Sequence, residues 1–276
     1  MTNGSSTNLE KISGAFILPP SAGKKLIGMG VAALPEVKHA YEKGRLAVAN
    51  GTTTGYVIEA LRGTPPKRFD YCVGVISGSM FTENPDSDHT LFMWINGEEK
   101  VVPFSEFLTE IRKFGPEDCF IKGANAIDPY GYAGGLQTNP NGGSWADAYG
   151  LMTARGIHCI VPVGQEKMIP SVVEAARKMG QMRLTYSHGS PAGLIPLTSF
   201  KVITEVEALK ILTGVDATPV AGGGIGGCEG SRAYAVEGTA EQVGKAFAVY
   251  KQVYNEPQIT VTGKTEALPY KMPAGW

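Results

Sequence analysis

The chain lacks the features that mark several broad functional classes. Lys and Arg number 25 against 26 Asp and Glu, so the net charge is −1, and no Lys/Arg run occurs. Proteins that bind nucleic acid or anionic membranes usually carry a basic excess. No apolar run reaches the roughly 18 residues that span a bilayer, and the polar first residues lack the apolar stretch of a secretory signal. We therefore expect a cytoplasmic protein with no nucleic acid and no membrane among its partners.

Cysteine and histidine are also scarce, with four of each. The cysteines form no Cys-x-x-Cys pair and sit beside strand-like apolar residues, which predicts buried, reduced thiols at Cys72, Cys119, Cys159 and Cys228. No second histidine stands at metal-ligand spacing, so we expect no metal.

Residues 222–227 contain the pattern G-x-G-x-x-G, yet the sequence does not predict a dinucleotide site there. That motif needs a helix immediately afterwards to receive the pyrophosphate. Here residues 231–236 alternate like a strand. A bulge or a Gly-rich lid is the expected structure.

What the sequence does contain is a series of short apolar strands that alternate with helical patterns. Residues 45–49, 71–76, 119–122 and 157–163 are almost entirely apolar, and helical patterns lie between or after them. Such strands are typical of a parallel sheet covered on both faces. Residues 91–103, with Asn-Gly at 96–97, predict a β-hairpin inserted in this series.

The pattern changes after residue 197. Segments 200–204, 206–212, 218–221, 231–236, 240–254 and 258–261 predict the order β-α-β-β-α-β, which fits a small ferredoxin-like unit. We therefore expect an α/β protein with a three-layer, Rossmann-like parallel-sheet domain and a small C-terminal α+β domain. The predicted divisions are an N-terminal arm over 1–21, the main domain over 22–196, the ferredoxin-like domain over 197–262 and a tail over 263–276.

The segment after the first strand is the best candidate for an anion site. A strand delivers the chain into a turn of glycine and hydroxyl residues, and a helix follows at once. The first N–H groups of a helix have no internal partner and carry partial positive charge, so phosphate or carboxylate is the expected guest. A plain threonine-capped helix is the alternative. The candidate residues are Asn50, Gly51, Thr52, Thr53 and Thr54, and Ser77 opens a second polar loop after the next strand.

Two further loops follow the third strand. Lys122 can neutralise an anion, Gly123 leaves room for close backbone approach, and Asn125 can both donate and accept hydrogen bonds. Asp128 either orients a ligand hydroxyl or caps the turn that follows it. The Gly-rich loop over 134–144 adds Asn139, Asn141 and Gly142, held either by a ligand or as a flexible surface loop.

These motifs together resemble the large group of ribose-5-phosphate isomerases, glucosamine-6-phosphate deaminases, CoA transferases and sugar-phosphate-sensing repressors. Residues 50–54 resemble the group's G-x-G-[ST]-[ST] loop, and residues 122–128 resemble the isomerases' D-G-A-D-E-[VI]-D. The chain is most similar to the LUD (lactate-utilisation) domains, through Gly-Ala-Asn-Ala-Ile at 123–127, Asn-x-x-Gly at 139–142 and Val-Gly with a following lysine at 163–167.

The resemblance covers roughly residues 22–190 and implies a protein that binds a small phosphorylated or carboxylated metabolite, as a homo-oligomer. It implies metal-free acid–base or group-transfer chemistry, although Lys122 and Asn125 stand where the isomerases have carboxylates. One alternative is a CoA or acyl transferase that acts through Glu229, for which a CoA ester is the implied cofactor. A second alternative is a non-catalytic sensor or assembly subunit.

Overall fold

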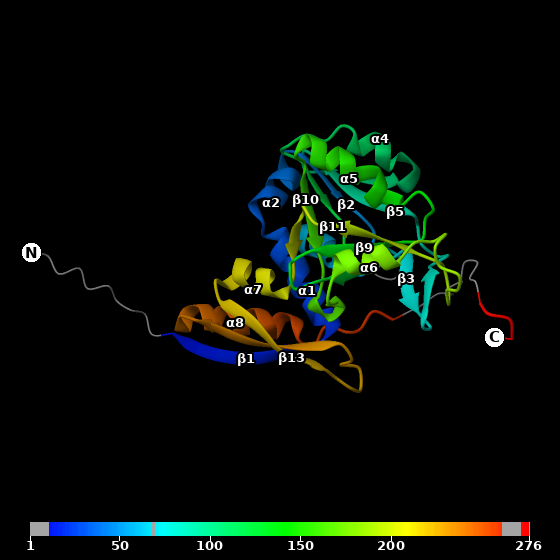
Figure 1. The fold of residues 1–276 in the computed structure, drawn as a ribbon. Coiled ribbons are helices and arrows are strands. Elements are labelled where there is room, and N and C mark those ends of the chain that lie inside the picture. Colours follow the sequence, from blue (N-terminus) through cyan, green and yellow to red (C-terminus); the bar gives the residue numbers. More distant parts are fainter. Residues whose placement is uncertain (1–10, 68–69, 261–271, 276) are drawn as a thin grey trace, which may run out of the picture.

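The centre of the fold is a six-stranded sheet, seen in a computed structural model that describes residues 11–67, 70–260 and 272–275 (Figure 1). Its strands lie in the order β12 (Lys201–Ile203), β10 (His158–Pro162), β7 (Cys119–Ile121), β2 (Arg45–Val48), β5 (Thr90–Ile95) and β6 (Glu98–Pro103). The first four are mutually parallel, and β5 and β6 form the antiparallel hairpin. The mostly parallel sheet and the hairpin are thus confirmed.

Helices cover both faces of this sheet. The described residues form eight α-helices: α1 (Pro20–Ala32), α2 (Pro35–Glu42), α3 (Thr52–Arg62), α4 (Phe107–Ile111), α5 (Gly143–Arg155), α6 (Val172–Lys178), α7 (Glu205–Thr213) and α8 (Ala240–Val253). Leu46 and Val48 of β2 join a core with residues of α1, α2, α3 and α7, whereas Ala47 joins a second core with residues of α4 and α5. Burial on both faces explains why the strands are continuously apolar.

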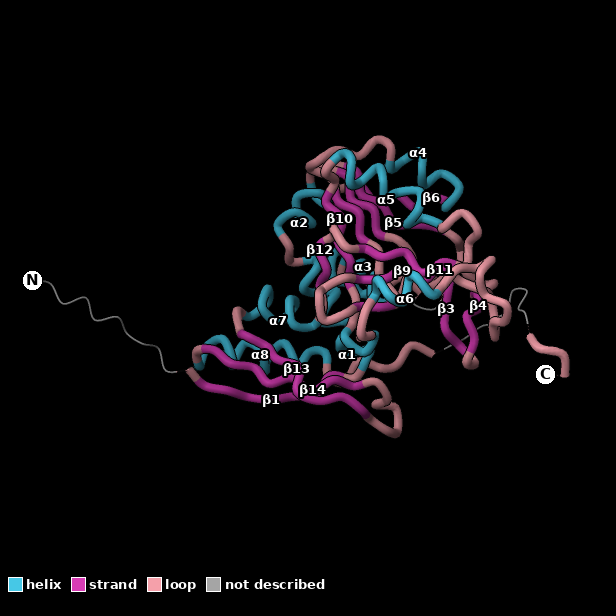
Figure 2. Tube along the Cα trace, in the orientation of Figure 1, coloured by secondary structure: helices cyan, strands magenta, loops and turns pink. Residues whose placement is uncertain are grey.

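Helix α1 lies between the central sheet and a smaller sheet, and glycines let it pack closely on its neighbours (Figures 1 and 2). A Cβ added to Gly28 would lie 2.6 Å from the backbone of Tyr56 in α3. One added to Gly30 would lie 2.7 Å from Ala208 Cβ in α7. Contacts this short leave no room for a larger side chain, so the two glycines fix how near α1 lies to α3 and α7.

The smaller sheet draws its strands from both ends of the chain, which corrects two predictions. Its order is β1 (Ile12–Leu18), β14 (Ser231–Gly238) and β13 (Asp216–Gly223), all antiparallel. The expected loose N-terminal arm over 1–21 is therefore wrong for Ile12–Leu18. Phe16 anchors this strand, because its ring stacks on Tyr250 of α8 at 4.8 Å and meets Phe247 edge-on at 5.5 Å.

The expected ferredoxin-like strand order is also altered. Strand β12, predicted as the first strand of the small unit, pairs with β10 of the central sheet instead. Residues 258–260, predicted as its last strand, have no regular structure, and Val261 lies outside the described residues. Strand β1 occupies the edge of β14. The domain boundary near 197 stays a prediction, and most of the predicted tail lies outside the described residues.

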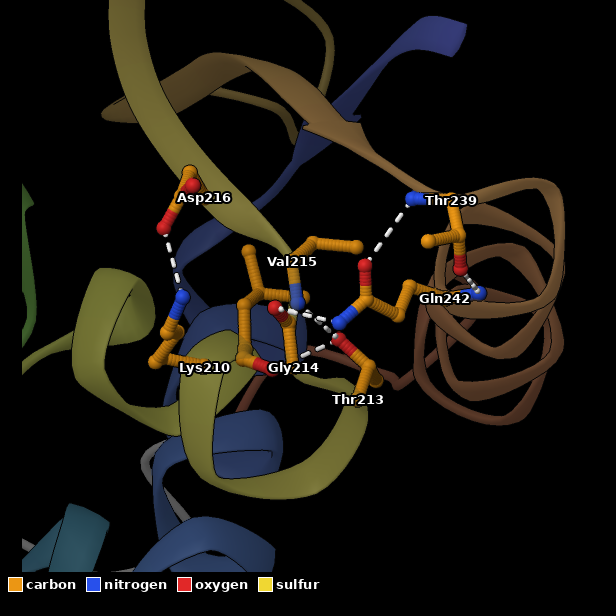
Figure 3. Close-up of polar contacts among 8 residues, drawn as sticks. Lys210, Thr213, Gly214, Val215, Asp216, Thr239 and Gln242 are labelled. Carbon is orange, nitrogen blue, oxygen red and sulfur yellow. Dashed lines mark hydrogen bonds and ion pairs between the residues drawn. The ribbon is translucent and has the colours of Figure 1, made fainter. Parts of the chain in front are cut away.

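The link between α7 and β13 is joined to the start of α8 by polar contacts (Figure 3). Thr239 and Gln242 form a capping box at the N-terminus of α8. The Gln242 side chain also donates from Nε2 to the Gly214 carbonyl at 3.1 Å. Lys210 and Asp216 close the turn from outside with an ion pair of 2.6 Å. These contacts hold the two helices of the small unit in one layer.

Several smaller predictions need correction. Residues 71–76 do not add a strand to the central sheet; instead β3 (Gly74–Ser77) pairs with β4 (Met80–Glu83) in a separate two-stranded ribbon. The loop expected over 134–144 begins as β9 (Ala133–Gln137), which pairs with β8 (Ala126–Ile127) and β11 (Gly193–Leu197). Cys228 is exposed in the hairpin between β13 and β14, whereas the other three free thiols are buried as predicted.

Candidate functional site

Four strands of the central sheet end at the same edge, because β2, β7, β10 and β12 are parallel. Their carboxyl ends lead into residues 50–54, 122–125, 163–167 and 204–205. Open α/β sheets bind ligands at the carboxyl ends of their strands. These four segments therefore bound the candidate site.

Residues 50–54, which we call the 50–54 turn, are held mainly by nearby backbone. The Gly51 N–H donates to the Tyr71 carbonyl at 3.0 Å, and Thr54 Oγ1 donates to the Gly51 carbonyl at 3.0 Å. The Asn50 amide donates to the Thr90 carbonyl at 2.6 Å. Its buried Oδ1 has no hydrogen-bond partner among the described residues. These three donors therefore stabilise the conformation of the turn and its contact with neighbouring backbone.

Helix α3 begins at this turn with no side-chain cap. Its N-cap is Gly51, whose φ of 152° is a conformation that favours glycine. A Cβ added there would meet only Thr54 Oγ1 within 4 Å. The space beside Gly51 is thus open, and the first N–H groups of an 11-residue helix lie next to it. The turn can receive an anion through its backbone, whereas the Thr54 hydroxyl is already engaged.

The segment after β7 contains a lysine without a hydrogen-bond partner among the described residues and an asparagine that is bonded to β9. Lys122 is half-buried, and its Nζ has no hydrogen bond or ion pair within the part of the chain that the structure describes. Burial lowers the pKa of Lys122 to about 8. A Cβ on Gly123 would lie 3.5 Å from the Pro162 carbonyl oxygen. Asn125 is exposed, and its Oδ1 accepts the Leu136 N–H at 3.1 Å, so Asn125 positions β9.

Asp128 caps a turn. Its Oδ1 accepts the N–H groups of Tyr130 and Tyr132, both at 3.0 Å, and its Oδ2 accepts the Val172 N–H at 2.9 Å. The side chain is 2% exposed. Both carboxylate oxygens are therefore engaged by backbone, and of the two roles considered the hydrogen bonds support the turn cap.

The later asparagines likewise order their own loop. Asn139 Oδ1 accepts the Asn141 N–H at 2.8 Å, and the Gly142 N–H donates to the Asn139 carbonyl at 2.9 Å. Gly142, at φ 81°, is the N-cap of α5. Gln181 closes the loop from the other side by donating to the Asn139 carbonyl at 2.8 Å. These bonds order the loop without a ligand.

Two predicted site residues lie elsewhere. Ser77 belongs to the β3–β4 ribbon, outside the central sheet. Glu229 is exposed in the β13–β14 hairpin, where its Oε2 accepts the Gly227 N–H at 3.0 Å. No hydrogen bond or ion pair between described residues joins either side chain to the four segments.

A second group of polar side chains, not selected from the sequence, lies at the same edge. Two belong to the short 3₁₀ turn Gln165–Lys167 after β10, one begins α7 after β12, and the others come from α1, β14 and the chain before β3. We call them the Glu166 cluster: Lys24, Cys72, Glu166, Lys167, Glu205 and Tyr234.

Glu205 is the most deeply placed carboxyl of this cluster, at 3% exposed. Its Oε2 accepts the Gln165 N–H at 3.0 Å, and the nearby Tyr234 hydroxyl donates to Gln165 Oε1 at 3.5 Å. A Cβ on Gly23 of α1 would lie 2.6 Å from its Oε1. Burial, and then the neighbouring charge of Glu166, raise the pKa of Glu205 to about 7. This carboxyl can therefore gain or lose a proton near neutral pH.

The lysines of the cluster have no carboxylate within ion-pair distance among the described residues. Lys167 instead donates to the Ala124 carbonyl at 2.9 Å. Burial lowers the pKa of Lys167; the charge of Glu166 opposes this effect, and that of Lys24 adds to it. Burial also raises the pKa of the Cys72 thiol to about 11, against the attraction of both lysines. Lys24 and Lys167 are thus close enough to repel each other.

Two hydrogen bonds to backbone carbonyls link the Glu166 cluster to the predicted loops. The bond from Lys167 to Ala124 joins the turn after β10 to the segment after β7. The bond from Gly51 to Tyr71 joins the 50–54 turn to the residue that precedes Cys72. Hydrogen bonds therefore connect the segments that carry the Glu166 cluster to both predicted loops.

Only weak signals for this cluster are present in the amino-acid sequence. Residues 163–167 were notable solely as part of the LUD resemblance. Glu205 reads as an ordinary acidic residue in the first turn of a helix, which the helix dipole favours anyway. Lys24 reads as a polar position of a surface helix. Their proximity depends on the pairing of β10 with β12, which no local pattern reveals.

The residues described in the structure contain no group of three or more His, Cys, Asp or Glu side chains that could hold a metal ion. Among those residues, no helix has the length and apolar character needed to cross a membrane. No family model, curated protein or solved structure matches this chain. The geometry of the carboxyl edge is therefore the basis on which a function can be assigned.

Proposed function

We propose that the protein binds a small phosphorylated or carboxylated metabolite at the carboxyl edge of β2, β7, β10 and β12. The observation that carries this proposal is the pair Lys24 and Lys167. Both are half-buried, they lie close enough for one charge to lower the pKa of the other, and neither is in an ion pair with a described carboxylate. An anion bound beside them relieves the repulsion and forms charge-assisted hydrogen bonds.

The 50–54 turn supplies a second attraction. The N-terminus of α3 presents unpartnered N–H groups and the positive end of a helix dipole next to the open side of Gly51. A phosphate or carboxylate near this turn is stabilised without any side-chain cap. The lysines and the helix end thus favour the same class of ligand.

The proposal extends to family and chemistry. We infer a Rossmann-like main domain with a ferredoxin-like small unit, in a LUD-like member of the isomerase and CoA-transferase group. Metal-free acid–base chemistry is supported by Glu205, whose pKa of about 7 suits proton transfer near neutral pH. Glu229 is exposed, and its carboxylate accepts a bond from Gly227, so nothing favours acyl transfer through it.

The test is a calorimetric titration of the full chain with inorganic phosphate, acetate and a panel of sugar phosphates and small carboxylates. The variants Lys24→Met and Lys167→Met remove one charge each but keep an apolar stem of similar length. Lys38→Met, at an exposed position of α2, is the matched control. Loss of a charged hydrogen-bond donor is expected to weaken anion binding by about tenfold or more per lysine.

Binding that falls in both cluster variants and not in the control would support the site. If no anion binds, or if the cluster variants bind like Lys38→Met, the proposal is wrong. Melting temperatures of all variants show whether a loss of binding reflects a loss of folding. Product analysis after long incubation with a bound metabolite separates an enzyme from a sensor.

A further inference from the structure

Glu166 carries a carboxyl group with which no described residue forms a hydrogen bond. Both of its carboxylate oxygens are buried, and neither has a hydrogen-bond partner among the described residues. A buried carboxylate is normally paired or fully hydrogen-bonded, because isolation from water is unfavourable for a charge. The two neighbouring charges do not solve this. Lys167 donates to the Ala124 carbonyl, and Glu205 is another acid.

The surroundings hold the Glu166 side chain in place. A Cβ on Gly164 would lie 1.9 Å from Glu166 Oε2, so the carboxylate is folded back against the Gly164 backbone. The β13–β14 hairpin covers the other side, where a Cβ on Gly230 would lie 3.8 Å from Glu166 Cβ. Gln165 is fixed too, since Arg232 Nε donates to its carbonyl at 3.1 Å. The unpaired carboxylate is therefore a positioned group rather than a loose surface side chain.

We propose that Glu166 accepts a hydrogen bond from a hydroxyl or ammonium group on the same small molecule whose anionic end lies at Lys24 and Lys167. This inference rests on the proposed function and narrows the ligand class to anions that also carry a hydrogen-bond donor. Glu166 lies near Lys24 and Lys167 but forms no ion pair with them among the described residues. A ligand with both an anionic group and a hydrogen-bond donor requires such an arrangement. The donor satisfies the carboxylate, and the anion satisfies the lysines.

The experiment uses three phosphates that differ only at one end: ethyl, 2-hydroxyethyl and 2-aminoethyl phosphate, together with their four-carbon counterparts. Each is titrated calorimetrically into the full-length protein, into Glu166→Gln, and into the control Glu98→Gln at an exposed position of β6. We expect the wild type and the control to bind a hydroxyl or amino phosphate about tenfold more tightly than the matching alkyl phosphate. Glu166→Gln is expected to lose most of that preference while it still binds the alkyl phosphate.

The outcomes separate the two proposals. Alkyl phosphate binding with no preference for either donor, or a preference that survives in Glu166→Gln, overturns the role of Glu166 and leaves the anion site intact. Failure of every phosphate and of inorganic phosphate to bind overturns both. Preference for the amino or for the hydroxyl phosphate identifies the donor. A strongly lowered melting temperature of unliganded Glu166→Gln would show that the carboxylate serves folding, which also overturns the inference.

Discussion

The 50–54 turn and the Gln165–Lys167 turn follow the two strands that flank β7, and they handle polar groups in opposite ways. In the 50–54 turn, the Asn50 amide, the Gly51 N–H and the Thr54 hydroxyl all donate to nearby backbone carbonyls. The Gln165–Lys167 turn leaves the Glu166 carboxylate without a hydrogen-bond partner among the described residues. The first turn is stabilised by hydrogen bonds to backbone, whereas the second positions a carboxylate that makes none.

This difference teaches which feature points to a ligand. Glycine and threonine after a strand indicate a tight turn and an open helix end, but the Gly51 N–H and the Thr54 hydroxyl are already bonded to nearby backbone. A buried carboxylate that has no hydrogen-bond partner after folding needs a donor from outside the described chain, such as a ligand. We therefore expect the 50–54 turn to respond mainly in stability, and the Glu166 cluster mainly in pH dependence and binding.

The largest expected effect is on the pH dependence of stability through Glu205. Its folded-state pKa of about 7 lies above the ordinary value of 4.5. Below pH 4.5 the carboxyl is protonated in both the folded and the unfolded state and does not reduce the free energy of unfolding. As pH rises to 7 the unfolded chain loses this proton first, so stability falls, by about 3 kcal/mol in full. Urea unfolding between pH 4.5 and 8 should show this fall in the wild type and in Glu98→Gln but not in Glu205→Gln. Parallel curves for all three would remove the predicted role.

The 50–54 turn is tested by two glycine substitutions that are expected to change the stability of the protein in opposite directions. Gly51→Ala forces a Cβ into a φ of 152° and should destabilise the protein by about 2 kcal/mol. Gly55→Ala lies inside α3, where the new Cβ would meet Pro66 at an ordinary 3.6 Å. It should stabilise by about 0.5–1 kcal/mol. Equal effects in equilibrium unfolding would show that the turn is not the constrained element described.

Gly164→Ala moves the Glu166 carboxylate without removing it. Gly164 has φ −77° and ψ 146°, which alanine adopts freely, so the new Cβ displaces only the end of the Glu166 side chain. We expect the preference for hydroxyl or amino phosphates to fall by about tenfold while the melting temperature changes by only a few degrees. Unchanged preference in the calorimetric titration would place the donor contact elsewhere.

The smallest expected effect concerns Lys122, whose pKa is lowered to about 8 from an ordinary 10.5. Below pH 8 the amine is charged in both states, and the cost of its burial is fully present. Between pH 8 and 10.5 the folded protein releases this proton first, so stability rises. Lys122→Met should therefore gain about 1 kcal/mol at pH 7 and flatten this rise, with Lys38→Met as control. Phosphate titration of the same variant tests whether Lys122 also belongs to the anion site.

Much of the fold could be predicted from local patterns. The continuous apolar runs at 45–49, 119–122 and 157–163 indicated buried parallel strands, and all three lie in the central sheet. The Asn-Gly pair located the hairpin turn, where Asn96 and Gly97 adopt φ values of 52° and 84°. These signals depend on burial and turn chemistry within a few residues, so a single sequence suffices to find them.

The candidate site was harder to predict, because its main charges come together only through tertiary structure. Glu166 and Glu205 meet because β10 pairs with β12. The predicted residues Asp128 and Asn139 have the right types for a site, but their side chains accept backbone N–H groups of their own turns. The residue types show which side chains are capable of binding a ligand. The hydrogen bonds that they already form within the fold decide which of them remain available.

The pairing of Ile12 with Gly238 has a consequence for synthesis on the ribosome. Strand β1 is among the first described segments to emerge, yet its neighbour β14 is translated more than two hundred residues later. At about 5–20 residues per second the delay is roughly tens of seconds, far longer than a hairpin needs to form. Throughout that time the apolar Ile-Ser-Gly-Ala-Phe-Ile-Leu segment has no edge to join. The length of the nascent chain, rather than local sequence, therefore decides when the smaller sheet can form.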